Sequence, residues 1–459
     1  MPPIKRLKAE FHSLNRLNPN ITVFIAYGLL YDVFLHIYKP FAIKFLERLG
    51  GTEFHIALLS ALPGFGAALA LLPGAILIGR RKSKQKLTSA FFLVSRFFIL
   101  LIAFVPAFPA ACQPLLFILF LSFMNLPEAV AQTSVQSFLG VIFDGRVRAT
   151  AIALRNKFGN IAVPAITLLT GLIIGILPQS DAERIIYYQG FYVAAFIISL
   201  IEIGVFKRLR ELPPKQLVGL PSSIDGNSKA DRDIETPQQP HQSTAEESSK
   251  VGLKAVFQIA ADSKFRHFMF TTLIFQFFWQ AGWPLTAIYQ IKTLGANELW
   301  LAMFAVGAGI ASFLSAGLWS KVIYKRGNGF SLVLAAFLMS LNMFFFALAP
   351  NLPIMFIVAI YSGAAVVGMN ISLLNGMLEA TPTKNRIIAI AFYNTFANIS
   401  LFLSPFFSNM LLQLVGIVNS LMLVGVGRTL AGALLLAVYL CGKKRKKTTG
   451  EKPCLSQLS

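Results

Sequence analysis

Three ionisable side chains share one face of an apolar stretch near the N-terminus. Asp32, His36 and Lys39 stand at positions i, i+4 and i+7, so on a helix they point the same way. An ionisable side chain at mid-bilayer costs roughly 2.5–3.5 kcal/mol on insertion scales, so it needs a partner or a function. This face could bind a polar solute or carry a proton. The alternative is a structural cluster in which Lys39 extends toward the membrane surface.

A second polar face is expected in the fourth apolar stretch. Glu128 and Gln132 are one helical turn apart, and Asn125 precedes them on the same segment. Burial favours the protonated form of a carboxyl, so Glu128 could load and release a proton. The alternative is a packing role, in which Glu128 pairs with Arg96 of the third apolar stretch.

The second half of the chain repeats these polar positions with uncharged residues. A displacement of 244 residues leads from the first face to Gln276, Gln280 and Trp283, and a displacement of 245 leads from Asn125 to Asn370. Matched polar faces are what a cavity between two related halves requires. The sequence therefore predicts one central substrate site, with Asp32 and Glu128 as candidates for proton coupling, and its lining is Asp32, His36, Lys39, Asn125, Glu128, Gln132, Gln276, Gln280, Trp283 and Asn370.

Arg155, Lys157 and Arg428 also lie inside apolar stretches. Arg155 and Lys157 fall in the first turns of the fifth stretch, where we expect them to extend to the membrane surface. Arg428 lies in the last stretch, and nothing in the sequence explains it.

The elements that must position these residues are transmembrane helices. Of the 459 residues, 55% are hydrophobic and only 13% are charged, which is too little charge for the surface of a soluble protein of this length. The apolar residues form runs of roughly 20, the length that crosses a ~30 Å hydrocarbon core. We predict an all-α polytopic membrane protein with twelve spans, near 21–46, 55–79, 87–106, 113–138, 149–177, 187–206, 266–292, 297–320, 330–349, 352–377, 386–412 and 417–441.

The net charge of +21 reflects topology and not a nucleic-acid partner. With the N-terminus inside, 32 of the 41 Lys and Arg residues fall in cytoplasmic segments, and three fall outside. This asymmetry is the positive-inside rule. It predicts a multi-pass protein of the cell membrane, in contact with lipid, with both termini in the cytoplasm and no nucleic-acid partner.

The two groups of six spans repeat each other. Displaced by 243, Gly64 and Gly74 match Gly307 and Gly317, and similar matches follow in the same order through later spans. Such a colinear series indicates a parallel internal repeat. The predicted organisation is an N-terminal half (1–206), a disordered cytoplasmic linker (207–250), an interfacial helix (251–265), a C-terminal half (266–441) and a basic tail (442–459).

Six plus six spans, a parallel repeat, a long central linker and basic loops after spans 2 and 8 resemble the major facilitator superfamily. The resemblance covers almost the whole chain, and it implies a secondary transporter whose site lies between the halves, lined by helices 1, 4, 7 and 10. The family's loop signature after span 2 is only partly present, because Ile78 stands where its Asp belongs. The basic residues that remain are expected to form a cytoplasmic gate, and they are Arg80, Arg81, Lys82, Lys325 and Arg326.

These features predict a secondary active transporter that moves a small polar or anionic solute by alternating access, with proton coupling as a hypothesis. An efflux pump for amphipathic compounds is the alternative within the class, favoured by the 12% of aromatic residues. A membrane-embedded sensor or enzyme is the alternative outside it. The three cysteines and five histidines show no ligand spacing and no nucleophile signature is present. We therefore expect no enzyme, no metal and no cofactor, and a monomer.

Overall fold

The computed structural model describes residues 19–79, 84–143, 145–210, 262–381 and 386–448, and these residues form helices joined by short loops. The first half holds α2 (Asn20–Tyr38), η1 (Lys39–Phe41), α3 (Ala42–Arg48), α4 (Glu53–Gly79), α5 (Lys84–Ala103), η2 (Val105–Ala107), α6 (Gln113–Ile142), α7 (Gly145–Ile176) and α8 (Asp181–Phe206). The second half holds α11 (Ser263–Ile288), η4 (Tyr289–Thr293), α12 (Glu298–Arg326), α13 (Asn328–Leu348), α14 (Leu352–Ala380) and α15 (Arg386–Thr448).

The predicted all-α fold is confirmed, and every predicted span falls on a helix at the expected place. The last two spans are the two arms of α15, which meet at Gly416 with a φ of 77°. A residue with a Cβ rarely adopts this backbone conformation, so glycine allows the sharp reversal. Nine segments of the described residues are long and apolar enough to cross a membrane, and one of them contains both arms. Twelve crossings therefore remain a prediction.

Helix ends follow ordinary capping chemistry. The Asn297 and Asn351 side chains accept hydrogen bonds from the backbone N–H groups of Trp300 and Ile354, at the starts of α12 and α14. Gly327, with a φ of 83°, separates α12 from α13. Local sequence thus sets where these helices begin and end.

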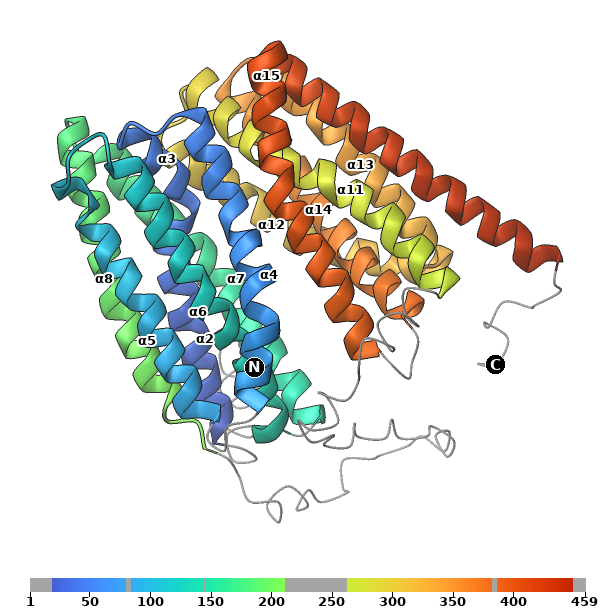
Figure 1. The fold of residues 1–459 in the computed structure, drawn as a ribbon, viewed down its shortest axis with the longest axis horizontal. Coiled ribbons are helices and arrows are strands. Elements are labelled where there is room, and N and C mark those ends of the chain that lie inside the picture. Colours follow the sequence, from blue (N-terminus) through green and yellow to red (C-terminus); the bar gives the residue numbers. More distant parts are fainter. Residues whose placement is uncertain (1–18, 80–83, 144, 211–261, 382–385, 449–459) are drawn as a thin grey trace, which may run out of the picture.

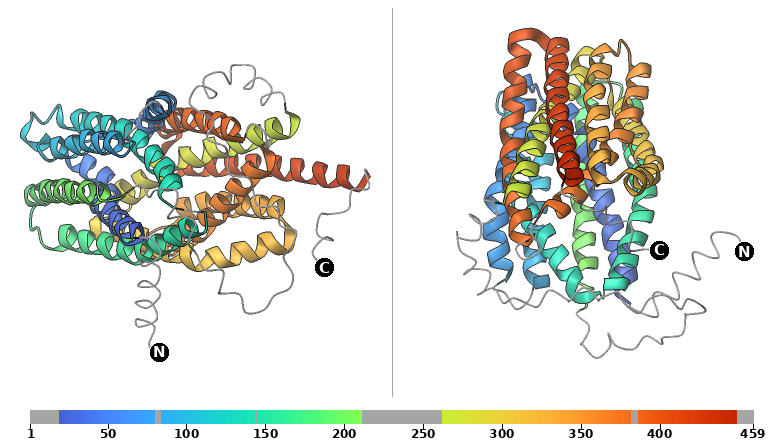
Figure 2. Two further views of the ribbon diagram at one scale, coloured as in Figure 1. Left: turned by 90° about the horizontal axis from the view of Figure 1, so that it is seen from below. Right: turned by 90° about the vertical axis from the view of Figure 1, so that its right-hand side faces the viewer.

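The helices form two bundles that correspond to the two halves of the sequence. In the first, α2 packs against α7 and α8, and α5 packs against α6 and α8. In the second, α11 packs against α15, and α12 and α13 pack against α14. Figure 1 shows the bundles side by side, and Figure 2 shows the same grouping from two other directions. The halves meet through α4 with α15 and through α7 with α12.

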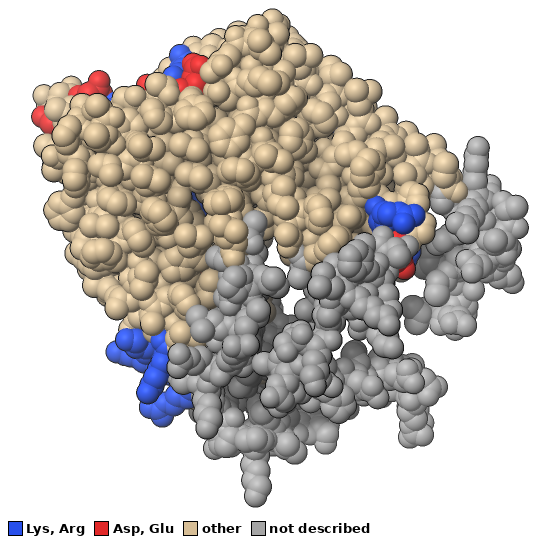
Figure 3. Space-filling model, in the orientation of Figure 1, with Lys and Arg blue, Asp and Glu red and all other residues tan. Residues whose placement is uncertain are grey.

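Charged residues mark two ends of the molecule. On the face drawn in Figure 3, Lys, Arg, Asp and Glu gather at the two ends, and the surface between them is almost free of charge. Large apolar side chains such as Leu314, Leu318 and Leu430 are exposed on the helices, as lipid contact requires. We call the end where α2 begins and α8 ends the basic end, and the end where α3 ends and α12 begins the far end.

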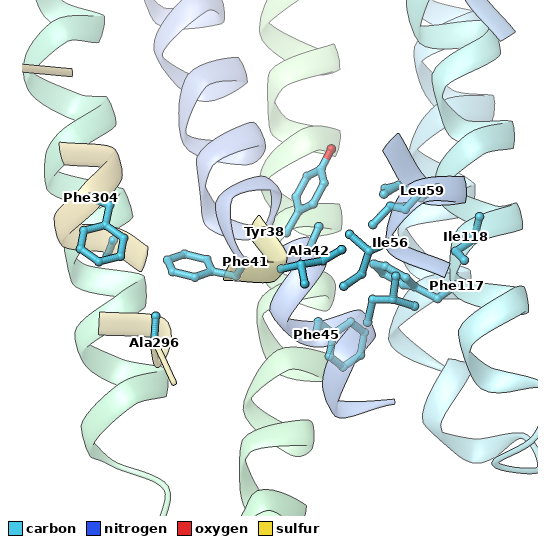
Figure 4. Packing of buried hydrophobic residues seen from close by; sticks show 14 of the residues in the cluster. Tyr38, Phe41, Ala42, Phe45, Ile56, Leu59, Phe117, Ile118, Ala296 and Phe304 are labelled. Carbon is cyan, nitrogen blue, oxygen red and sulfur yellow. The ribbon is translucent and has the colours of Figure 1, made fainter. Parts of the chain in front are cut away.

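An apolar core joins the two halves near the far end. Phe41 of η1 points toward Phe304 of α12 and toward Ala296, which precedes that helix (Figure 4). Glycines let the backbones approach here. A Cβ on Gly175 of α7 would lie 3.1 Å from the Cβ of Leu299, and one on Gly64 of α4 would lie 2.8 Å from a carbonyl oxygen of α15. In Figure 1 the two halves diverge from this region toward the basic end.

Candidate functional site

The second half contains a polar cavity of about 480 Å³ on its side toward the first half. Gly64 of α4 approaches Asn398 and Leu401 at its edge, so the cavity borders the contact between the halves. The side chains around it are mainly amides and indoles. They come from α11, α14 and the first arm of α15, and they are Gln276, Trp279, Gln280, Trp283, Val366, Asn370, Asn394, Ala397, Asn398 and Leu401.

The polar groups of the cavity differ in how they are paired. Gln276 Oε1 is buried and has no hydrogen-bond partner in the described part of the chain. Gln280 is held more firmly, because its Oε1 accepts a hydrogen bond of 2.9 Å from Ser400 and its Nε2 donates to the carbonyl oxygen of Ala397 at 3.4 Å. The rings of Trp279 and Trp283 meet edge to face, with centroids 6.3 Å apart. The cavity thus presents hydrogen-bonding groups beside aromatic surface.

All four site residues predicted in the second half line this cavity. Gln276, Gln280 and Trp283 come from one face of α11, and Asn370 comes from α14. Their role in binding remains a prediction. Asn394 and Asn398 of α15 were missed, although they stand one turn apart in the segment that revealed the internal repeat.

In the first half, Asp32 forms an ion pair with Arg155. Arg155 Nη2 lies 2.5 Å from Asp32 Oδ1, and both side chains are mostly buried between α2 and α7. Glycines make room for the pair: a Cβ on Gly159 would lie 2.6 Å from Asp32 Oδ2, and one on Gly28 would meet the Arg155 side chain. The expectation that Arg155 extends to the membrane surface is therefore wrong. A carboxylate deep in the bundle attracts the guanidinium inward.

The two other residues of the first polar face lie differently. The Nδ1 atom of His36 is 2.8 Å from the backbone oxygen of Asp32, so the ring is tied to its own helix. Lys39 is exposed at the end of this helix and forms no ion pair with any described residue. Asp32 and His36 are thus adjacent, and Lys39 is an available cation one turn away.

Glu128 and Gln132 belong to a buried network centred on Arg96. The Arg96 side chain is completely buried, and its guanidinium pairs with Glu128 of α6 and with Glu202 of α8. Ser95 and Gln132 donate hydrogen bonds of 3.0 Å to the two Glu128 oxygens. The structure thus contains the pair of Glu128 with Arg96 that the sequence offered as the alternative to a proton site. It also contains a second carboxylate, Glu202, which that alternative did not include.

Glu202 and its contact with Arg96 were missed by sequence reasoning. The only available signal was a lone acidic residue in the otherwise apolar span of α8. Asn125 is a smaller case. Its Nδ2 donates a hydrogen bond of 2.8 Å to the backbone oxygen of Leu121, so its side chain is directed to its own helix.

Arg428 is the buried cation of the second half. Its side chain is 1% exposed and donates to three backbone oxygens, those of Phe278 and Trp279 in α11 and of Met339 in α13. Among the described residues, no carboxylate pairs with it. Arg428 thus binds the backbone of α11, the helix that also carries Gln276, Gln280 and Trp283 of the cavity.

Ion pairs at the far end connect the halves directly. Arg48, at the end of α3, contacts Glu298 at the start of α12 at 2.6 Å and Asp181 at 2.5 Å. Tyr188 adds a hydrogen bond of 3.1 Å to the fully buried Glu298. A second, looser pair joins Lys292 to Glu53 at 3.6 Å. Arg48 and Lys292 are two of the three basic residues that the sequence places outside, and it predicts no partner for either.

The predicted gate residues are described only in part. Arg80, Arg81 and Lys82 lie outside the described residues. Lys325 and Arg326 are exposed at the last turn of α12, where the Arg326 guanidinium lies 4.9 Å from the centre of the Phe330 ring. The predicted linker (207–250) and interfacial helix (251–265) also fall almost wholly outside the described residues.

Solved transporter structures share this fold. The nucleoside transporter NupG is similar over 91% of this chain and 98% of its own, with a TM-score of 0.64 and 13% identity. A D-xylose–proton symporter (TM-score 0.61, 15% identity) and a bacterial homologue of the human lysosomal transporter Spinster, solved inward-facing and unoccupied (TM-score 0.61, 14% identity), each cover 91% of this chain and 96% of their own. At these identities the likeness shows the fold alone.

The sequence comparisons are consistent with this fold. No curated protein sequence matches the chain significantly. The profile of the Major Facilitator Superfamily matches residues 23–375, which is more than three quarters of the chain. Together with the two helical bundles, the apolar band and the transporter neighbours, this match shows that the chain belongs to the major facilitator superfamily, a family of membrane transporters.

Proposed function

We propose that this protein is a secondary active transporter of the cell membrane that moves a small polar or anionic solute by alternating access. The observation that carries the proposal is the amide-lined cavity of the second half, at the border between the halves. A volume of about 480 Å³ lies within the range of small-molecule sites. The proposed binding residues are those predicted from the sequence, together with Asn394 and Asn398.

The chemistry of the cavity favours a hydrogen-bonding solute with a ring or other flat apolar face. The unpaired Gln276 Oε1 needs a donor, because a buried polar atom without a partner costs about 1–3 kcal/mol. The indoles of Trp279 and Trp283 offer faces on which a ring can pack. Across the interface, Lys39 is the described cation that could meet an anionic group. An amphipathic drug without a hydrogen-bond donor would leave Gln276 Oε1 unsatisfied.

The contacts between the halves support an inward-open state. The Arg48–Glu298 pair, the Lys292–Glu53 pair and the packing of Phe41 all lie toward the far end. The halves diverge toward the basic end (Figure 1), which the positive-inside rule assigns to the cytoplasm together with both termini. The transition to the outward-open state would break these contacts, and the predicted basic gate residues of each half would then approach the other half.

Proton coupling through Asp32 or Glu128 completes the proposal. Each carboxylate forms a buried ion pair with an arginine of a neighbouring helix, Arg155 or Arg96. A proton that neutralises either carboxylate, or an anionic substrate group that competes with it for the arginine, would change how α2 packs against α7, or how α5 packs against α6. Such a change is one way to link loading of the site to movement of the halves.

The first experiment is a ligand-stabilisation screen on the purified full-length protein. Sugars, nucleosides, amino acids, organic acids and amphipathic drugs are tested for a rise in melting temperature, since a ligand at 100 times its Kd stabilises by about 2.7 kcal/mol. Hits are then tested for uptake into proteoliposomes. We expect polar solutes to bind, and stabilisation only by amphipathic drugs would favour the efflux alternative.

Matched variants locate the binding site. Gln276→Ala and Asn370→Ala should weaken binding of the hit at least tenfold. Asn419→Ala is the control, because this exposed amide lies on the second arm of α15 away from the cavity and donates only to a backbone oxygen of its own helix. Equal loss of binding in all three variants, or in none, would contradict the proposed site.

A further inference from the structure

The network around Arg96 contains one more carboxylate than it has cations. Arg96 Nη2 donates to Glu202 at 3.0 Å, and Nη1 donates to Glu128. The side chains of Arg96 and Glu202 are completely buried, and that of Glu128 is 12% exposed. With both carboxylates ionised, the three groups would carry a net charge of −1 in an apolar interior. Like charges this close to one another in a dry site rarely ionise together.

The hydrogen bonds show which carboxyl is better suited to carry the charge. Glu128 receives donors from Arg96, Ser95 and Gln132, and such donors stabilise a carboxylate. Glu202 receives one donor, from Arg96. Its Oε1 atom is buried and has no partner in the described part of the chain. Glu202 therefore has the weaker support for a negative charge.

The groups that face Glu202 from the neighbouring helices do not supply a second cation. From α2 these are the phenols of Tyr27 and Tyr38, which are neutral near pH 7. From α5 and α6 they are Arg96 and Glu128. Lys39 forms no ion pair with Glu202 or Glu128 among the described residues.

We infer that Glu202 carries a proton in this conformation and that Arg96, Glu128 and Glu202 form the proton-binding site of the transporter. The proton adds to the unpaired Oε1 of the Glu202 carboxylate and gives a neutral carboxyl, so the charge of the network rises from −1 to 0. Release of the proton to water restores the carboxylate. This inference rests on the proposed transport function and names the group that would couple it to protons.

The network also contacts the helix that carries the first polar face. The Arg96 guanidinium lies 4.0 Å from the centre of the Phe34 ring in α2, two residues beyond Asp32. Glu202 belongs to α8, which packs along α2. A change of charge at Glu202 therefore acts on the position of α2, and through it on Asp32 and His36.

Infrared difference spectroscopy on the purified protein in lipid tests the proton directly. A protonated carboxyl has a C=O stretching band that a carboxylate lacks. We expect such a band near neutral pH, and we expect Glu202→Gln to remove it. The amide keeps the shape and the contact with Arg96, so this variant should melt within a few degrees of the wild type. Glu183→Gln, which changes an exposed carboxyl of the same helix, is the control and should keep the band.

A second variant covers the case in which Glu202→Gln does not fold. Glu202→Asp keeps a carboxyl in a different position, so the band should persist at a shifted frequency. Absence of the band in the wild type, or an unchanged band in the Gln or Asp variant, would overturn the inference.

Transport distinguishes this inference from the proposed function. With a substrate from the screen, Glu202→Gln should keep counterflow exchange but reduce accumulation driven by a pH gradient to the level without a gradient. Full accumulation in this variant would overturn the coupling role of Glu202. Wild-type protein that has the band but moves no solute would instead contradict the proposed transport function, and the proton on Glu202 would stand.

Discussion

The two halves each bury an arginine, and they satisfy it in different ways. In the first half, Arg96 is paired with two carboxylates. In the second half, Arg428 is surrounded by three backbone oxygens and has no carboxylate partner among the described residues. Carboxylates can gain and lose protons, whereas backbone oxygens cannot. In terms of the proposed function, the first half would hold the titratable groups and the second half the neutral part of the proposed binding surface.

The internal repeat places the two arginines at related interfaces. At the displacement of 244 that matches Pro106 to Pro350, Arg96 corresponds to Ser340, the neighbour of the Met339 whose carbonyl accepts from Arg428. The cation therefore comes from α5 in one half and from the second arm of α15 in the other. The related helix interfaces of the two halves thus both contain a buried arginine, but the arginine comes from a different helix in each half and donates to different groups.

The largest effect is expected for Arg96→Met. This change removes the cation that pairs with Glu128 and donates to Glu202, and breaking a buried ion pair by removing one partner costs about 3–5 kcal/mol. The melting temperature in detergent should fall strongly. The triple variant Arg96→Met, Glu128→Gln, Glu202→Gln should recover part of the loss, and no recovery would mean that the packing of Arg96 on the Phe34 and Phe92 rings dominates.

The ion pair between α2 and α7 is the next test. Gly159→Ala places a methyl group 2.6 Å from Asp32 Oδ2, and overpacking of this kind costs about 1–3 kcal/mol. Solute exchange should fall with stability, because Asp32 or Arg155 must move. Gly309→Ala is the control, since no atom lies within 4 Å of the added Cβ. Equal exchange in the two variants would show that the position of Asp32 does not matter.

Arg428→Met should cost much less than Arg96→Met. The carbonyls of Phe278 and Trp279 lie inside α11 and keep their helical hydrogen bonds, while a desolvated charge is removed. We expect a change of about 1 kcal/mol in either direction, measured by thermal unfolding. A loss as large as that of Arg96→Met would break the comparison between the halves.

The smallest effect is expected at the looser contact between the halves. Lys292 and Glu53 are both partly exposed, and pairs of this kind contribute about 0–1 kcal/mol. Lys292→Gln should therefore leave the population of the inward-open state almost unchanged, as measured by distances between spin labels across the far end. Arg48→Gln leaves the buried Glu298 unpaired and should shift that population clearly.

The fold could be predicted because its signals are local or repeated. Runs of apolar residues mark helices wherever they pack, and the colinear matches mark the halves. The sequence could predict that Gln276, Gln280 and Trp283 lie together, since they share one helix face, and they line one cavity; their role in binding stays a prediction. The partners of the charged residues could not be predicted. Arg155 reaches Asp32 across 123 positions of sequence, and Arg48 reaches Glu298 across 250.

Glu202 shows most clearly why the partners of charged residues could not be predicted from the sequence. Alone in an apolar span, it could have pointed to lipid headgroups, to a cavity or to another helix. Only the packing of α8 against α5 brings it to Arg96. Asp32 and Glu128 were selected because ionisable or amide neighbours one turn away marked their faces, whereas Glu202 has only the small Ser199 at that spacing on its own helix.

If the protein works by alternating access as proposed, the glycines of α7 would affect how readily the two halves tilt against each other. At Gly171 and Gly175 the backbone of α7 lies directly against the first turn of α12, with no side chain from α7 inserted between them. At such a contact one helix can tilt over the other without first separating interlocked side chains. The rate of the conformational change would then be limited by breaking the ion pairs at the far end, and not by repacking of side chains between α7 and α12.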